Sequence, residues 1–118
     1  MAFVDNKPRT INFSRETVGK VLLAADCVTG DLLAYNSGWK LATATTVTSC
    51  VVACEDGVIG ETINVTPFAL IKSITGMTAG TALYTAAAGA YQGSTGKRMG
   101  ISLSDNEAYV LPVLVPIT

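Results

Sequence analysis

Residues 32–41 read Leu32-Leu33-Ala34-Tyr35-Asn36-Ser37-Gly38-Trp39-Lys40-Leu41. In this stretch two short apolar runs flank a polar tripeptide of asparagine, serine and glycine. Asparagine and glycine readily adopt the positive φ angles that tight turns between antiparallel strands require. The stretch therefore predicts a β-hairpin with one strand on each side of the tripeptide.

The same alternation of short apolar runs and turn signals continues through the sequence from residue 28 onward. Turn signals recur about every 8 to 15 residues, at Thr29-Gly30-Asp31, Asp56-Gly57, Thr75-Gly76, Ala79-Gly80, Gly93-Ser94-Thr95-Gly96 and Asp105-Asn106. Valine and threonine, which favour strands, are frequent between the turns. We therefore predict an all-β fold, either a compact small β-barrel or a β-sandwich.

Two segments are harder to assign. Residues 14–28 carry apolar residues at helical spacing, namely Val18, Val21, Leu22 and Ala25. Gly19 and the β-branched valines oppose a helix, so we favour a strand or loop there. The run Ala86-Ala87-Ala88 is too short for a stable helix and precedes Gly89, so we expect a loop.

The two halves of the sequence follow one order of glycine turns and strands. Four pairs of segments align: 30–33 with 80–83, 38–39 with 89–90, 52–56 with 101–105, and 61–65 with 107–111. Chance similarity among strands rich in glycine, threonine and alanine is the alternative interpretation. A true repeat predicts a duplicated hairpin motif, with halves near 28–66 and 78–113, closed into one small barrel or sandwich.

The composition narrows the classes of function. The chain has 118 residues, of which 49% are hydrophobic and 14% are charged, with a net charge of −1 and no histidine. Such a sequence is unlike disordered chains, which are polar and charged, and unlike nucleic-acid-binding proteins, which need a basic surface. Histidine-based catalysis and histidine-ligated metals are excluded, and no apolar run is long enough to predict a membrane span.

The cysteines and carboxylates do not predict a reactive site. The three cysteines, Cys27, Cys50 and Cys54, are an odd number and lack partner ligands for zinc, so we interpret them as buried thiols of a protein folded in a reducing cytoplasm. Glu55 and Asp56 are adjacent, so on a strand they would face opposite sides, and a surface turn is the favoured interpretation. We expect no enzyme activity, no cofactor and no metal.

The first fifteen residues differ from the rest of the chain. Residues 1–20 carry four basic and two acidic side chains, and hydrophobic residues are spaced without a helical period. We predict an extended N-terminal arm over residues 1–15 and a single β domain over 16–118. A frayed terminus is the alternative.

Several motifs together resemble the small capsid decoration (cement, or head-stabilising) proteins of tailed bacteriophages. They cover residues 28–111: Gly30-Asp31-Leu32 followed by Tyr35, Val52-Ala53-Cys54-Glu55-Asp56-Gly57, Gly60-Glu61 followed by Ile63 and Val65, Thr78-Ala79-Gly80-Thr81 followed by Leu83-Tyr84, and Met99-Gly100-Ile101-Ser102-Leu103. Members of that family often carry Gly-Val where this chain has Val51-Val52, and only Gly100-Ile101 keeps that glycine here.

The resemblance implies a tulip-like β domain that forms a homotrimer on the outer surface of an icosahedral phage head. The implied partners are the major capsid protein and other copies of the chain, with no nucleic acid, membrane or small-molecule substrate. It also implies a virion structural protein made in the bacterial host cytoplasm, without enzyme activity. Two alternatives stay open: a tail or fibre β module, and a small β-barrel that binds a hydrophobic ligand.

Candidate contact residues follow from these expectations. The apolar, slightly basic arm has no evident partner within the chain, so we hypothesise that it docks on the capsid protein. Its candidate contacts are Phe3, Val4, Pro8, Arg9, Ile11 and Phe13. Three aromatic residues outside basic clusters are candidate anchors of the subunit interface: Trp39, Tyr84 and Tyr91.

Overall fold

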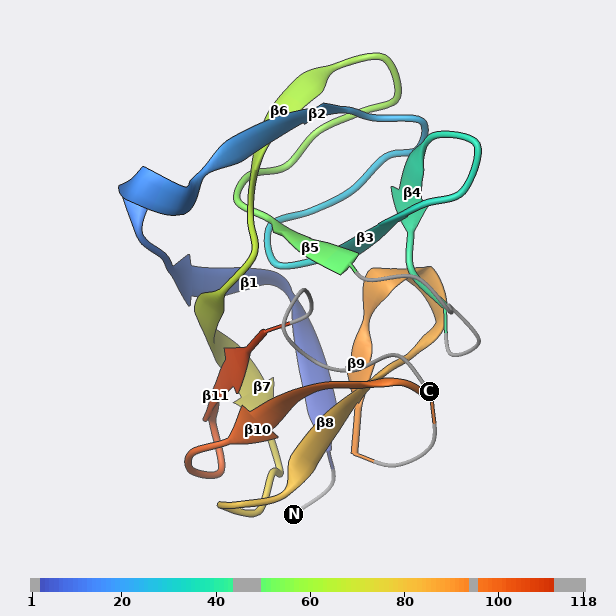
Figure 1. Ribbon diagram of the computed structural model, residues 1–118. Coiled ribbons are helices and arrows are strands. Elements are labelled where there is room, and N and C mark those ends of the chain that lie inside the picture. Colours follow the sequence, from blue (N-terminus) through green and yellow to red (C-terminus); the bar gives the residue numbers. More distant parts are fainter. Residues whose placement is uncertain (1–2, 44–49, 94–95, 112–118) are drawn as a thin grey trace.

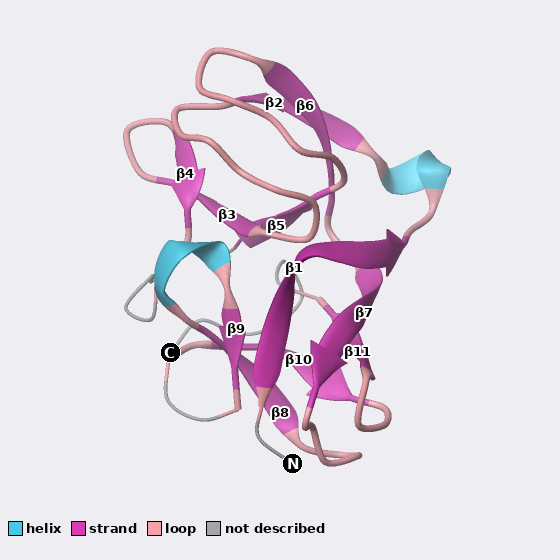
Figure 2. Ribbon diagram, turned by 180° about the vertical axis from the view of Figure 1, so that it is seen from behind, coloured by secondary structure: helices cyan, strands magenta, loops and turns pink. Residues whose placement is uncertain are grey.

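The computed structural model describes residues 3–43, 50–93 and 96–111, and their regular structure is almost entirely β (Figure 1). Within these residues the strands form two antiparallel sheets, and two short 3₁₀ turns accompany them (Figure 2). The strands are β1 (Val4–Asn12), β2 (Gly19–Leu22), β3 (Leu32–Tyr35), β4 (Trp39–Leu41), β5 (Cys50–Ala53), β6 (Thr62–Thr66), β7 (Ala69–Thr75), β8 (Ala82–Thr85), β9 (Tyr91–Gln92), β10 (Arg98–Ser102) and β11 (Glu107–Val110), and the turns are η1 (Arg15–Thr17) and η2 (Ala87–Gly89). The all-β prediction is confirmed.

The five-stranded sheet has the order β2-β6-β5-β3-β4 and lies in the upper half of Figure 1. It curls until its two edges meet, because Leu23 forms a parallel bridge with Trp39 and the Ala24 N–H donates to the Trp39 carbonyl at 2.9 Å. The interior of this curl holds one of the two cores: Val21, Leu23, Cys27, Leu33, Ala53, Ile63 and Val65. Closure of this kind hides the exposed edge of a sheet.

The six-stranded sheet has the order β1-β7-β11-β10-β8-β9 and lies below. Its edge strands approach each other through a side chain, because the Asp5 carboxylate of β1 accepts a hydrogen bond from the Tyr91 N–H of β9 at 3.0 Å. The larger core fills its interior and includes Leu32, Val52, Ile71, Ile74, Leu83, Met99 and Val110.

The two sheets repeat one strand order, since β6-β5-β3-β4 corresponds to β11-β10-β8-β9. Equivalent hydrogen bonds occur in both: Gly30 N–H donates to the Ala53 carbonyl and Gly80 N–H to the Ser102 carbonyl, each at 2.8 Å. The first aligned segments therefore occupy equivalent places.

The last aligned pair needs a correction of three residues. Cys54 N–H donates to the Asn64 carbonyl, whereas Leu103 N–H donates to the Glu107 carbonyl. Asn64, and not Glu61, is therefore the equivalent of Glu107. The shift arises because the connection from β10 to β11 is shorter than the connection from β5 to β6, so matching the acidic residues misplaces the register.

The remaining local predictions agree with the structure, apart from the arm. The predicted hairpin is present, with Tyr35 opposite Trp39. Residues 14–28 contain η1 and the strand β2 rather than a long helix, and Ala87 and Ala88 of the alanine run form the short turn η2 with Gly89. The N-terminal segment is extended, but it has a partner within the chain, because β1 pairs with β7 along the edge of the six-stranded sheet.

Candidate functional site

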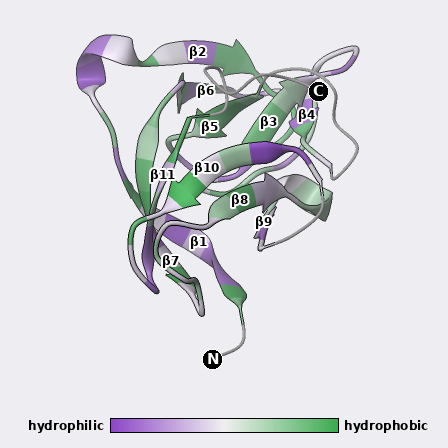
Figure 3. Cartoon of the chain, turned by 60° about the horizontal axis from the view of Figure 1, so that its bottom comes forward, coloured by the Kyte–Doolittle hydropathy of each residue, from purple (hydrophilic) through white to green (hydrophobic). Residues whose placement is uncertain are grey.

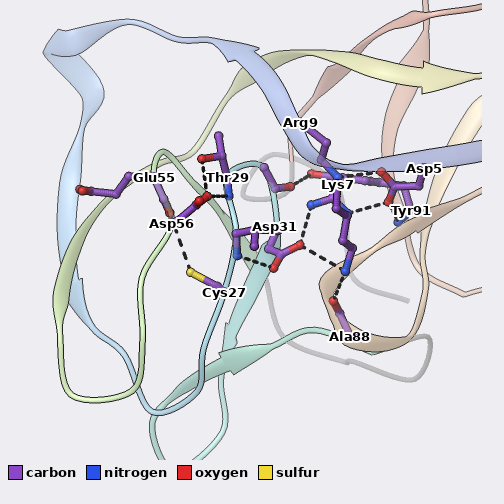
Figure 4. Close-up of polar contacts among 12 residues, drawn as sticks. Asp5, Lys7, Arg9, Cys27, Thr29, Asp31, Glu55, Asp56, Ala88 and Tyr91 are labelled. Atoms are coloured by element: carbon purple, nitrogen blue, oxygen red, sulfur yellow. Dashed lines mark hydrogen bonds and ion pairs between the residues drawn. The ribbon is translucent and has the colours of Figure 1, made fainter.

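A buried cluster of charged side chains joins the N-terminal strand to both sheets (Figure 4). The Arg9 guanidinium donates two hydrogen bonds to Asp5, at 2.7 and 2.6 Å, and a third to Asp31. It also lies over the Tyr91 ring, with its central carbon 5.0 Å from the ring centroid. We call Asp5, Lys7, Arg9, Asp31 and Tyr91 the Arg9 cluster.

The side chains of Asp5, Lys7 and Arg9 of β1 meet on one side, as their contacts show: Arg9 binds Asp5, and both Arg9 and Lys7 contact Asp31. Simple strand alternation does not explain this, because the pairing of β1 with β7 shifts register between Asp5 and Thr10. Lys7 Nζ lies 3.5 Å from an Asp31 oxygen and donates to the Ala88 carbonyl at 2.9 Å. Gly30 provides the room for Arg9, since a Cβ there would lie 2.6 Å from Arg9 Cδ. The cluster thus fixes β1 against the start of β3.

The polar groups of this cluster are satisfied by one another. Asp31 accepts a further hydrogen bond from the Val28 N–H at 2.9 Å, and the Tyr91 hydroxyl donates to the Gly30 carbonyl at 2.7 Å. Burial by itself lowers the pKa of Arg9, but the hydrogen bonds to Asp5 and Asp31 raise the pKa above its ordinary value. Burial raises the pKa of Tyr91. Both groups therefore keep one protonation state, which suits a structural junction.

The candidate arm contacts divide into inward and outward residues. Arg9 is 3% exposed and belongs to the cluster, so we no longer assign it to a capsid contact. Phe3, Ile11 and Phe13 are half-buried and pack against the larger core of their own chain. Val4 and Pro8 are exposed.

The three aromatic candidates for a subunit interface also differ. Tyr91 is 3% exposed and is engaged within its own chain, so it is a core residue. Trp39 is half-buried and meets the exposed ring of Tyr35 edge-on, with centroids 5.5 Å apart. Tyr84 is half-buried on β8. Only Trp39 and Tyr84 are therefore accessible in part.

A patch of apolar side chains that sequence reasoning missed covers the outside of the six-stranded sheet. Tyr109 lies opposite Ile101 on one side and opposite Leu70 on the other, so the three side chains share a face. The Phe68 ring stacks on Tyr109 with centroids 5.4 Å apart. Figure 3 shows hydrophobic residues on β10 and β11 in this region. We call Phe68, Leu70, Ile101, Leu103 and Tyr109 the outer patch.

A second apolar group lies at an end of the five-stranded sheet. Leu22, Val58 and Ile59 are 62%, 54% and 65% exposed. Leu22 ends β2, and the neighbouring Leu23 pairs with the turn that carries the other two, because Leu23 N–H donates to the Glu61 carbonyl at 2.8 Å. We call these three residues the apolar tip. The alternation of apolar and polar residues along the strands did not predict that these three side chains are exposed, because they lie in or next to a turn.

Two open recesses are present among the described residues. One has a volume of about 350 Å³ and is lined by Phe13, Arg15, Val18 and Asn64, where η1 passes β6. The other, of about 200 Å³, lies beside Phe3, Met77 and Leu83. Both recesses are partly open to solvent rather than enclosed.

The three cysteines are thiols outside any disulfide, and their reactivity is low. Burial raises the pKa of Cys27, Cys50 and Cys54 to about 11 in each case. The thiolate is the reactive form, so a pKa two units above the ordinary value of 9.0 leaves about a hundredth of the usual thiolate at pH 8.

We therefore expect Ellman's reagent at pH 8 to label the folded chain roughly a hundredfold more slowly than the chain unfolded in urea. Raising the pH towards 11 should accelerate labelling of the folded chain. Equal rates for folded and unfolded chains at pH 8 would contradict the assigned thiol environments.

Neither a metal site nor similarity to a compared protein assigns a function. Within the described ranges, no group of three histidine, cysteine, aspartate or glutamate side chains is placed to hold a metal ion. The helical segments of that same part of the chain are too short to cross a membrane. Comparison with family models, with curated proteins and with solved structures finds no match. A functional argument therefore rests on the residues of this chain.

Proposed function

We propose that the chain is a virion structural protein that binds the outside of an icosahedral phage head and stabilises the capsid lattice. In this proposal the partners are the major capsid protein and other copies of the chain, as a homotrimer. The chain acts without enzyme activity or a cofactor, and it binds no nucleic acid or membrane.

The outer patch is the observation that carries the proposal. Its residues Ile101, Leu103, Phe68 and Tyr109 are 38–43% exposed and lie together on one sheet face. Contiguous apolar surface of this kind is typical of interaction sites, and partly exposed aromatic residues are the usual anchors of interfaces. A broad, rigid sheet face suits contact with the wide surface of a capsid shell.

The sequence adds two supporting points. The order of glycine turns and strands is similar to that of the decoration proteins, and the described strands form an all-β fold, which is compatible with this similarity. The low charge of 14% leaves much of the surface apolar, as expected of a chain that covers surface against neighbours.

Burial of the N-terminal segment argues against our expectation that it supplies the capsid contact. Most of the apolar side chains of that segment pack on their own chain, and Arg9 is buried in its cluster. We therefore place the capsid contact at the outer patch, with Val4 and Pro8 as the remaining accessible candidates from the segment.

The variant Tyr109→Ser tests this placement. We expect it to bind capsids of the phage that encodes the chain at least tenfold more weakly than the wild type, because truncating an aromatic anchor costs an interface about 2 kcal/mol or more. Binding is measured by co-sedimentation with purified capsids lacking the chain. Tyr35→Ser is the matched control, since it removes an exposed tyrosine from the other sheet.

The control should bind as the wild type does, and circular dichroism should show that both variants are folded. Absence of wild-type binding would overturn the proposed function. Equal binding by Tyr109→Ser and the wild type would overturn the assignment of the outer patch.

A further inference from the structure

Three turns of the chain share one backbone conformation, and one of them carries an unusual side chain. The turns 28–31, 58–61 and 78–81 share one pattern, in which the third residue is a glycine with φ of +85°, +92° and +85°. In each, that glycine N–H donates to a backbone carbonyl, that of Ala53, Leu23 and Ser102 respectively, at 2.8, 2.9 and 2.8 Å. The turn thus tolerates different side chains at its second position.

The second position holds Thr29, Ile59 and Ala79 in the three turns. Polar or small residues are usual in turns, so Ile59 is the exception, and it is 65% exposed. Because the same turn forms with threonine or alanine, turn geometry does not explain the isoleucine. An exposed aliphatic residue at such a place is instead suited to contact with another molecule.

The apolar tip is also held rigidly in its exposed position. The Val58 N–H donates to Glu61 and the Ile59 N–H donates to Asp26, each at 2.8 Å. These bonds fix the backbone before any partner arrives, which lowers the entropy cost of binding. Within the described residues neither carboxylate forms an ion pair. The tip therefore combines apolar side chains with two adjacent negative charges.

The recess at η1 has the complementary character. Phe13 and Val18 supply apolar walls, and Arg15 supplies a positive charge that forms no ion pair among the described residues. Its volume of about 350 Å³ is equivalent to about ten water molecules, which is room for a branched aliphatic side chain.

We propose that the apolar tip of one copy inserts Val58 and Ile59 into the recess of a second copy, where Arg15 faces Asp26 and Glu61. The contact joins two different surfaces, so each copy contributes its tip to one neighbour and its recess to another. A rotation of one third of a turn between successive copies closes such contacts into a ring of three. This inference deepens the proposed function, because it assigns the surfaces through which the homotrimer would form. It leaves the outer patch free to face the capsid.

The test uses two single variants and their mixture. Ile59→Thr, which installs the side chain found at residue 29, impairs the tip, and Arg15→Glu impairs the recess. We expect each to self-associate at least tenfold more weakly than the wild type in sedimentation velocity experiments. Ile101→Thr is the matched control, because it makes the same change on the outer patch and should associate as the wild type does.

Mixing the two variants tests specifically for a contact between the tip of one copy and the recess of another. Arg15→Glu retains an intact tip and Ile59→Thr retains an intact recess, so an equimolar mixture should form a species of twice 12.2 kDa that neither variant forms alone at the same total concentration. A monomeric wild type, an Ile59→Thr variant that associates normally, or a mixture without dimer would each overturn the inference.

The failure of this contact and the failure of the proposed function are distinguishable. A monomeric wild type that binds capsids would refute the contact alone. A wild-type oligomer that does not bind capsids would refute the proposed function alone.

Discussion

Replacing Arg9 by alanine should lower the free energy of unfolding by about 3–5 kcal/mol. The reason is the environment of the two carboxylates that Arg9 neutralises. The side chains of Asp5 and Asp31 are 9% and 3% exposed, so without the guanidinium their charges remain buried with only Lys7 nearby. Removing one member of a buried ion pair costs more than the pair contributes, because the partner left behind is poorly solvated.

Urea denaturation of Arg9→Ala and the wild type measures this effect. Arg9→Lys should recover only part of the loss, because an ammonium group lacks the fork that binds Asp5 through two bonds. Lys72→Ala is the control, because it removes a cation from an exposed ion pair. Lys72 Nζ lies 3.8 Å from a Glu107 carboxylate oxygen, and both side chains are about 40% exposed. We expect this variant to lower the free energy of unfolding by about 1 kcal/mol or less. If Arg9→Ala costs no more than Lys72→Ala, the cluster does not join β1 to the sheets.

The stabilising role of β1 complicates truncation experiments. Deleting residues 2–13 removes β1, and with it the Arg9 cluster and the edge strand that pairs with β7. Loss of capsid binding in such a variant would reflect an unstable domain rather than a missing contact. Point substitutions on the outer patch avoid this problem.

Replacing Gly100 by valine should destabilise the domain by about 3 kcal/mol. Gly100 is buried on β10 opposite Val110, and a Cβ at this position would collide with the backbone carbonyl oxygen of Tyr109. The clash involves backbone atoms of a paired strand, so no side-chain rotation relieves it. The pairing of Gly100, Ile101 and Ser102 with β11 is regular, so the close approach is part of the ordinary strand pairing.

The equivalent position in the other sheet is the natural control. Val51 pairs regularly with Leu33 and is half-buried, so Val51→Ala should cost about 1 kcal/mol. Thermal or urea unfolding of both variants gives the comparison. If Gly100→Val lowers the free energy of unfolding no more than Val51→Ala does, the close approach of β10 and β11 does not limit the side chain at residue 100.

The glycine turns made much of the fold predictable from sequence. The polar tripeptide at 36–38 and the recurring turns located most strands, because turn chemistry is local and specific. The repeat predicted the matching order of the two sheets. Its last segment was misplaced because acidic residues were matched, whereas register depends on connection length.

The long-range features were not accessible in the same way. β1 pairs with β7, a strand far along the sequence. The sequence of residues 4–12 alone does not indicate which strand it pairs with. The opposite charges of Asp5, Lys7 and Arg9 were an available signal, since nearby opposite charges often neutralise one another. It became interpretable only when Asp31 was seen beside them. The outer patch was equally hidden, because it is assembled from β7, β10 and β11.

An electron cryomicroscopy reconstruction of capsids decorated with the chain tests the central claim most directly. The account predicts density for the domain on the outside of the shell, with Tyr109, Ile101 and Phe68 against the capsid protein and the turn carrying Ile59 directed at a neighbouring copy. Domain density with the outer patch facing solvent, or capsids that carry no added density, would contradict it.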